Sequence, residues 1–123
     1  MKKVSFLGPV ADIREVLRSA DVFVITSITE ALPLSVIEAI AMGLPCIVTD
    51  VGGISDIIED GEQGFLVAPG DYRAIARFLV YFITHPIERK NMARAARMKA
   101  VNCFNFDQMF QKYRDLFDDV VQL

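Results

Sequence analysis

Apolar positions follow two different periods in the first 70 residues of the chain. Short runs of mostly β-branched or aromatic residues end in Gly, Pro or polar turns, which is typical of buried strands; they lie at 4–7, 21–27, 45–50 and within 64–71. Between these runs, apolar residues recur every three or four positions, which is the period of a helix. Helices are therefore predicted over 12–20 and 32–43, and the range 51–61 is predicted to hold a Gly-rich turn, a short helix and a Gly stop.

From residue 71 onward the strand pattern stops, and three helices are predicted over 71–85, 86–101 and 105–121. The last of them carries a continuous amphipathic stripe, made of Phe106, Met109, Phe110, Tyr113, Leu116, Phe117 and Val120. Strands that alternate with helices predict an α/β layered fold with a parallel sheet, here of about four strands. We expect a single domain over residues 1–123, with a β/α core in 1–70 and a helical part in 71–123.

Composition and charge narrow the possible functions. The chain has 123 residues, 53% of them hydrophobic, with a mean hydropathy of +0.35, which is high for a small domain. This apolar excess indicates either a well-filled core or a surface that another domain or subunit covers. A net charge of −3 argues against binding to nucleic acid or to an anionic membrane. No apolar run reaches the ~18 residues of a membrane-spanning helix.

Cysteine, histidine and basic residues further limit the possible metal sites, locations and partners. Cys46 and Cys103 form no C-x-x-C motif and His85 is the only histidine, so no zinc site is expected. Reduced thiols and the lack of an apolar leader segment predict a cytoplasmic location. Five cations of one predicted helix indicate a solvated face or, as the alternative, a surface for an acidic partner; they are Arg89, Lys90, Arg94, Arg97 and Lys99.

Two acids, Glu30 and Glu38, stand in the segment 29–45 among almost only apolar residues. Because Pro33 belongs at a helix start, Glu30 is predicted in a loop and Glu38 in the second turn of a buried helix. No Lys or Arg occurs in 19–72 to pair with them. Ligand hydroxyls would satisfy such carboxylates, and the free N–H groups of a helix start attract phosphate. The pattern therefore predicts a site for a nucleotide or a nucleotide-sugar.

A second polar loop, after the predicted strand 45–50, contains Gly52 and Gly53. Glycines let backbone approach a ligand closely, although a plain strand-to-helix turn is the simpler interpretation. In parallel sheets, ligands bind beyond the carboxyl ends of the strands, and Glu30 falls in one of these loops. The loop is neither a Walker loop nor a dinucleotide-binding fingerprint.

The chain resembles the C-terminal donor-binding domain of glycosyltransferase family 4, whose members are retaining enzymes with the GT-B fold. The family pattern has two glutamates separated by seven residues, then Ala-x-Ala-x-Gly-x-Pro, a strand, a Gly-Gly pair and an Asp-Gly or Asn-Gly pair. In this sequence the matching positions are Glu30, Glu38, Ala39, Ala41, Gly43, Pro45, Gly52, Gly53, Asp60 and Gly61. The resemblance covers nearly the whole chain and implies a Rossmann-like sheet.

The resemblance implies a nucleotide-sugar as substrate and assigns roles to residues of this chain. Glu30, the expected catalytic residue, would contact hydroxyls of the transferred sugar without acting as a covalent nucleophile, and Glu38 would bind the ribose diol. Transfer would retain the configuration, form an α-glycosidic bond and need no metal or other cofactor. The other expected donor-binding positions are Val10 and Asp12 beside the base, and Ala31, Leu32, Pro33 and Leu34 beside the sugar and phosphates.

Relative to the family, the chain looks N-terminally truncated. It would lack the acceptor domain and the first two β-α units of the donor domain, whose cations neutralise the donor diphosphate; only Arg14 lies near the predicted loops. In a Rossmann sheet order, the missing strands would leave a gap between 4–7 and 21–27. We expect that 4–7 moves beside 21–27, or that another copy of the chain or the missing N-terminal domain covers this edge.

Two functions remain open from the sequence. The first is a glycosyltransferase domain that binds a nucleotide-sugar donor and is incomplete as an enzyme on its own. The alternative is a non-catalytic module that binds nucleotide-sugars or supports assembly. Binding without turnover would favour the alternative. A receiver domain of similar length is excluded, because the chain lacks its early acidic pair and its Lys at the end of a late strand.

Overall fold

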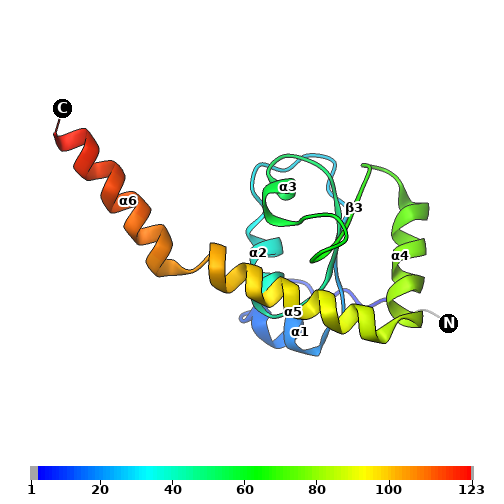
Figure 1. Ribbon diagram of the computed structural model, residues 1–123. Helices are drawn as coiled ribbons and strands as arrows, with labels where there is room; N and C mark the ends of the chain where they lie inside the picture. Colours follow the sequence, from blue (N-terminus) through cyan, green and yellow to red (C-terminus); the bar gives the residue numbers. More distant parts are fainter. Residues whose placement is uncertain (1–2, 123) are drawn as a thin grey trace.

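The computed structural model describes residues 3–122, which form a parallel sheet with helices on both faces (Figure 1). The strands β1 (Phe23–Ile25), β2 (Cys46–Thr49) and β3 (Gly64–Val67) lie in the order β1-β2-β3. The helices are α1 (Ile13–Ser19), α2 (Leu34–Ala41), α3 (Ile54–Ile57), α4 (Tyr72–Thr84), α5 (Pro86–Cys103) and α6 (Phe106–Val121). The prediction of an α/β fold with a parallel sheet is therefore confirmed.

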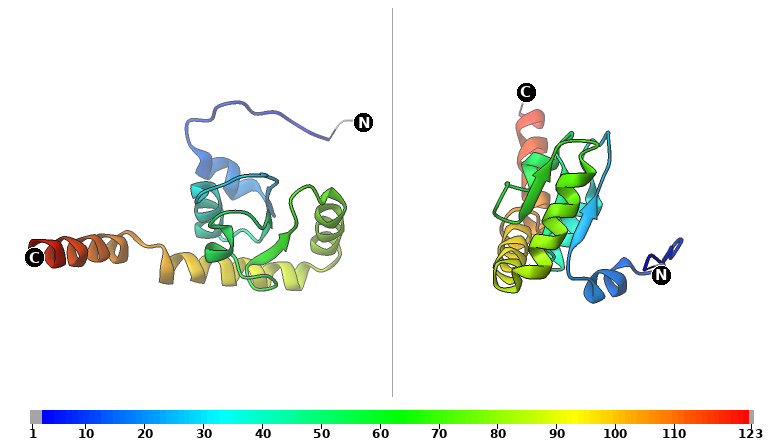
Figure 2. Two further views of the ribbon diagram at one scale, coloured as in Figure 1. Left: turned by 90° about the horizontal axis from the view of Figure 1, so that it is seen from above. Right: turned by 90° about the vertical axis from the view of Figure 1, so that its right-hand side faces the viewer.

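Each face of the sheet carries its own apolar cluster, because successive residues of a strand point to opposite faces. On one face, Cys46 and Val48 pack against buried residues of α1, α2, α3 and α5. On the other face, Ile47 and Val67 pack against α4, whose Phe82 is 1% exposed. Figure 2 shows this division, with α4 on one side of the strands and α1 and α2 on the other. The central strand β2 is thus buried from both sides, as its continuous apolar sequence predicts.

Side-chain caps fix where several helices begin. The Asp12 carboxylate accepts a hydrogen bond from the N–H of Arg14 at 2.9 Å, before α1. The Asp71 carboxylate accepts one from the N–H of Ala74 at 3.0 Å, before α4. Both aspartates satisfy N–H groups that a helix start leaves free.

The strand predicted at 4–7 is wrong. Residues 3–11 form no regular structure and are exposed, and Phe6 is 97% exposed. Because β1 pairs only with β2, the sheet of residues 3–122 has three strands, fewer than the four expected, and 4–7 does not move beside β1. An apolar run becomes a strand only where a neighbouring strand takes up its backbone hydrogen bonds, and 4–7 has no such neighbour here. Coverage of the β1 edge by another copy or domain stays a prediction.

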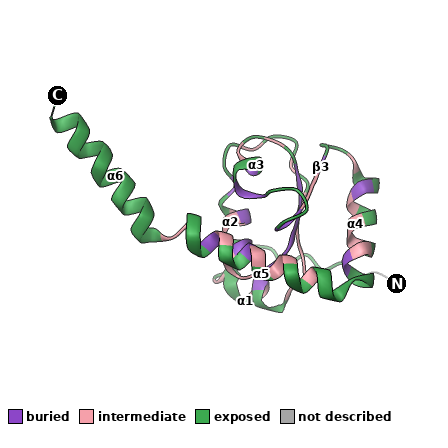
Figure 3. Ribbon diagram, viewed as in Figure 1, coloured by how far each residue is buried: buried purple, intermediate pink, exposed green. Residues whose placement is uncertain are grey.

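Helix α6 extends away from the rest of the protein, and Figure 3 shows it exposed along its length. None of its described residues is buried, and its predicted apolar stripe faces solvent, with Phe106 at 69% exposure and Phe117 at 65%. Part of the apolar excess noted in the sequence therefore lies outside the core. Within residues 3–122, none of the helices combines the length and apolar character that a bilayer crossing demands.

The sequence suggested that the cations of α5 form a solvated face, but three of the five contact other elements of the fold. Three of them hold α5 against the rest of the fold: Arg89 donates to the Phe82 carbonyl, Arg97 donates to the Ala41 carbonyl, and Lys99 pairs with Glu59. Lys90 and Arg94 are exposed, as predicted. Most of this basic cluster thus joins elements of the chain itself.

Candidate functional site

The loop from β1 to α2 carries Glu30 and lies against the loop that follows β2. The Glu30 carboxylate accepts a hydrogen bond from the Ser27 hydroxyl, with 2.7 Å between Oγ and Oε1, and both side chains are half-buried. The N–H of Gly53 donates to the Ala31 carbonyl at 2.6 Å. Because both loops follow carboxyl ends of adjacent parallel strands, they lie where ligands bind in such sheets.

The start of α2 offers free backbone donors. Pro33 is the N-cap, one position earlier than a first-turn proline, and makes no side-chain cap hydrogen bond. Its carbonyl accepts from the N–H of Val36 at 3.1 Å, and the first turn contains no acidic residue. The N–H groups of Leu34 and Ser35 precede the first intrahelical donor, so they remain available to an anion.

Helix α2 is less completely buried than its apolar sequence predicts. Val36, Ala39 and Ile40 are buried, but Leu34 is 68% exposed at the free end of the helix. The neighbouring positions Ala31 and Leu32 are exposed too, whereas Pro33 is buried. Three of the four residues expected beside sugar and phosphates therefore lie open to solvent.

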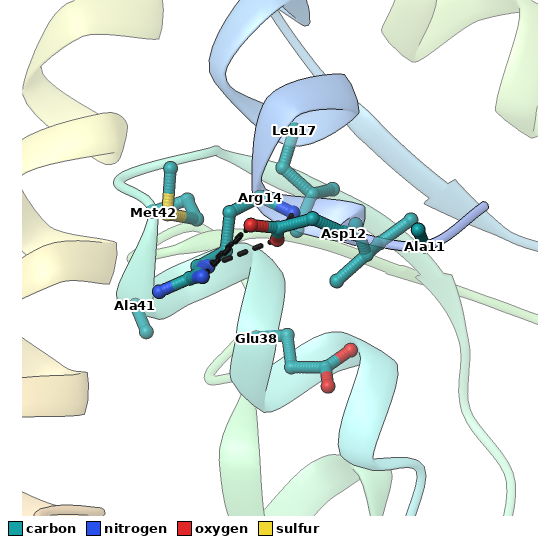
Figure 4. Close-up of a pocket in the computed structure, with 8 residues that line it drawn as sticks. Ala11, Asp12, Arg14, Leu17, Glu38, Ala41 and Met42 are labelled. Carbon is teal, nitrogen blue, oxygen red and sulfur yellow. Dashed lines mark hydrogen bonds and ion pairs between the residues drawn. The ribbon is translucent and has the colours of Figure 1, made fainter.

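A hollow of about 360 Å³ separates the start of α1 from the middle of α2 (Figure 4). The Glu38 side chain is exposed on the α2 side, and its carboxylate makes no hydrogen bond or ion pair with residues 3–122. Asp12 lies on the opposite, α1 side. The residues that line the hollow are Ala11, Asp12, Ile13, Arg14, Leu17, Glu38, Ala41 and Met42.

Asp12 and Arg14 form an ion pair at the rim of this hollow. The guanidinium binds both carboxylate oxygens, with Nη2 at 2.8 Å from Oδ2 and Nε at 2.9 Å from Oδ1. This hydrogen bonding by Arg14 lowers the pKa of Asp12 to about 2. The cation nearest the predicted loops is therefore already engaged, and its side chain is largely exposed to solvent.

The sequence-predicted residues thus fall into two groups. Asp12 and Glu38 face the same hollow, while Glu30 and Ala31 belong to the loop that contacts Gly52 and Gly53. Val10 is exposed beside this hollow without lining it.

Ser27 and Thr49, neither of them predicted as a site residue, form a chain of hydrogen bonds with Glu30. The position of Ser27, three residues before Glu30 at the end of a predicted strand, could have indicated that its hydroxyl reaches the Glu30 carboxylate.

The cysteines and the acidic residues give no metal centre among residues 3–122, where no three metal-ligating side chains gather. Both cysteines are free; Cys103 is exposed, whereas burial raises the pKa of the Cys46 thiol to about 12. Cys46 is therefore a packing residue of the sheet, as its apolar sequence context predicts. A metal-free reaction stays a prediction.

Comparison with known proteins identifies the class of protein. Residues 1–99 match the family of Glycosyl transferases group 1, and the chain belongs to this family. It is 35% identical over 120 residues to the UDP-Gal:alpha-D-GlcNAc-diphosphoundecaprenol alpha-1,3-galactosyltransferase of Escherichia coli, covering 98% of this chain and 31% of that enzyme. The chain thus spans about a third of the length of this relative.

Solved structures show the same fold. HepE from Anabaena, crystallised in complex with UDP, matches with a TM-score of 0.90 and 26% identity, over 93% of this chain and 32% of HepE. HepE was also solved with UDP-glucose. The C-terminal domain of a group 1 glycosyl transferase from Francisella tularensis matches with a TM-score of 0.75 and 27% identity, over 84% of this chain and 53% of that one.

Proposed function

We propose that the chain is the C-terminal donor-binding domain of a retaining glycosyltransferase of family 4, and that α2 with its preceding loop holds a nucleotide-sugar. One observation carries the proposal: Glu30 precedes a helix start without a side-chain cap, and Glu38 in that helix faces a hollow with an unpaired carboxylate. A GT-B relative solved with UDP and UDP-glucose matches most of the chain, which supports the same ligand class.

Each part of the donor finds a chemical complement in this arrangement. The Glu38 carboxylate can accept two hydrogen bonds from the vicinal hydroxyls of a ribose, and the hollow beyond it accommodates a base near Val10 and Asp12. The free N–H groups of Leu34 and Ser35 can donate to the diphosphate. Glu30 then stands beyond the phosphates, where it would accept hydrogen bonds from hydroxyls of the transferred sugar.

Turnover needs more than this donor site. Departure of a nucleoside diphosphate develops negative charge, and the rate depends on cations placed beside it. Arg14 pairs with Asp12 at the rim of the hollow, so the Asp12 carboxylate offsets its positive charge there. We therefore propose that the chain binds donor but transfers sugar only with residues from an N-terminal domain or a second copy. The same observation favours the alternative of a non-catalytic nucleotide-sugar-binding module. Retention, metal independence and a cytoplasmic location belong to this proposal.

Calorimetric titration with UDP and UDP-glucose tests the donor site. Because hydrogen bonds to a charged group contribute ~1.5–3 kcal/mol, Glu38→Gln should weaken binding of both ligands by about tenfold or more. Glu30→Gln should weaken UDP-glucose binding and leave UDP binding unchanged. Glu62→Gln is the matched control, since Glu62 is exposed in the turn before β3. Equal affinities of wild type and Glu38→Gln for UDP would contradict the assignment.

A turnover assay tests whether the isolated chain is incomplete as an enzyme. Release of UDP from UDP-glucose, with water or added sugars as acceptors, should be undetectable for a chain that binds the donor tightly. Turnover by the isolated chain at rates usual for glycosyltransferases would show that the cations of other domains are not needed.

A further inference from the structure

We propose that Ser27 is a positioning residue for Glu30, and that a contact between two loops holds the pair at the sugar end of the donor site. The inference rests on the proposed function, because it gives Glu30 its role toward the sugar. It adds a reason why this carboxylate, on a loop without regular structure, keeps one orientation. Ser27 itself would touch no donor atom.

The Ser27 hydroxyl holds one oxygen of the Glu30 carboxylate and leaves the other free. The distance of 2.7 Å between Ser27 Oγ and Glu30 Oε1 is that of a charge-assisted hydrogen bond. Among residues 3–122, no side chain or backbone group donates to Glu30 Oε2. A carboxylate fixed through one oxygen can present the second oxygen to a ligand hydroxyl with little loss of rotamer entropy.

Ser27 is fixed in turn by the central strand. Thr49, the last residue of β2, is fully buried, and its hydroxyl donates to the Ser27 carbonyl at 2.6 Å. A hydrogen bond from a buried group on a paired strand restrains the backbone where β1 ends. The chain of contacts runs from β2 through Ser27 to Glu30, and it crosses 22 positions of sequence between Thr49 and Ser27.

The Gly-Gly turn supports the other side of the same loop. A Cβ on Gly52 would lie 1.8 Å from the Glu30 carbonyl oxygen, and one on Gly53 would lie 2.8 Å from the Ala31 carbonyl oxygen. The glycines therefore admit the backbone of residues 30–31, which packs directly on them. The sequence suggested that these glycines approach a ligand or form a plain turn; their close neighbour is the loop that carries Glu30.

Paired titrations of the full 123-residue chain test the inference. Ser27→Ala should lower the affinity for UDP-glucose about tenfold, because Glu30 then samples several rotamers, while the affinity for UDP stays unchanged. Ser27→Thr keeps the hydroxyl and should restore UDP-glucose binding. Ser55→Ala, an exposed serine of α3, is the control and should alter neither ligand. A loss that affects UDP and UDP-glucose equally would indicate general damage and would overturn the positioning role.

A measurement without ligand distinguishes failure of the Ser27–Glu30 contact from failure of the proposed function. Three-bond NMR couplings across χ1 of Glu30 should report one staggered rotamer in the wild type and averaged values in Ser27→Ala. If the wild type binds neither UDP nor UDP-glucose, the proposed function falls, and these couplings still decide whether Ser27 holds Glu30. Averaged couplings already in the wild type, or unchanged couplings in Ser27→Ala, would overturn the inference.

Discussion

The substitution Gly52→Ala would test how tightly the two loops of the site are packed. Gly52 has a φ of +55° in the turn after β2, and its Cα faces the Glu30 carbonyl. An alanine Cβ would lie 1.8 Å from that oxygen, a distance that real Cβ atoms do not reach. The loop around Glu30 would have to move away by more than ~1 Å, because folded interiors lack the space to absorb such an overlap.

The expected cost has two parts. A left-handed φ disfavours alanine relative to glycine by ~1 kcal/mol. Moving the loop also breaks the hydrogen bond from the Gly53 N–H to the Ala31 carbonyl, worth ~0.5–1.5 kcal/mol net. Together they predict that the free energy of unfolding falls by ~1.5–2.5 kcal/mol. Gly70→Ala isolates the first part, since Gly70 has a φ of +81° and no atom lies within 4 Å of its Cβ position.

Urea unfolding followed by far-UV circular dichroism measures both variants. Gly52→Ala should unfold at a clearly lower urea concentration than Gly70→Ala, with the same dependence on denaturant, because the surface exposed on unfolding is unchanged. If the two variants differ by less than ~0.5 kcal/mol, the contact between the loops contributes nothing and the reasoning is refuted.

Four further predictions concern the core, the two cysteines and α6. Phe82→Ala should lower the free energy of unfolding by ~3–5 kcal/mol because Phe82 is 1% exposed, whereas Ile83→Ala, at a position 72% exposed, should stay within ~0.5 kcal/mol of wild type in urea unfolding. Burial raises the pKa of the Cys46 thiol from about 9.0 to about 12. Above pH 9 the folded protein therefore keeps the thiol proton while the unfolded chain loses it, so the free energy of unfolding should fall as the pH rises. The fall should be less steep in Cys46→Ala. A thiol reagent at neutral pH should modify Cys103 and spare Cys46 until the protein unfolds. Deletion of residues 105–123 should leave the urea midpoint unchanged, because no described residue of α6 is buried; a clear drop would show that α6 packs on the core.

Local patterns predicted much of the fold. Apolar runs predict the strands around 23–25, 46–49 and 64–67. Helical spacing and capping residues predict the helices that begin after Asp12 and Asp71. All of these signals act over a few positions. The prediction of a strand at 4–7 was wrong because strand formation is not purely local. Its apolar sequence suits a strand, but a strand also requires a paired neighbour, and sequence spacing does not reveal whether one is present.

The candidate site was predictable only in part. The two glutamates stood out because carboxylates are rare in so apolar a segment, and the structure leaves both half-buried or exposed near a helix start. The hydrogen bond from Thr49 to Ser27 and the packing of Gly52 on Glu30 join positions about 22 residues apart in the chain. Such contacts depend on strand order and loop geometry, so no local pattern indicates them. Asp12 and Arg14 are only two residues apart, so their ion pair is local. That Asp12 takes up the Arg14 charge, which a phosphate would otherwise meet, is seen only in the structure.

Amide chemical-shift perturbation on the ¹⁵N-labelled chain reports which residues contact the donor. Titration with UDP should shift the amides of Leu34, Ser35 and Glu38, and UDP-glucose should additionally shift those of Glu30 and Ala31. Perturbations confined to α6 or spread over the surface, or none at all at millimolar ligand, would contradict a donor site built on α2 and its preceding loop.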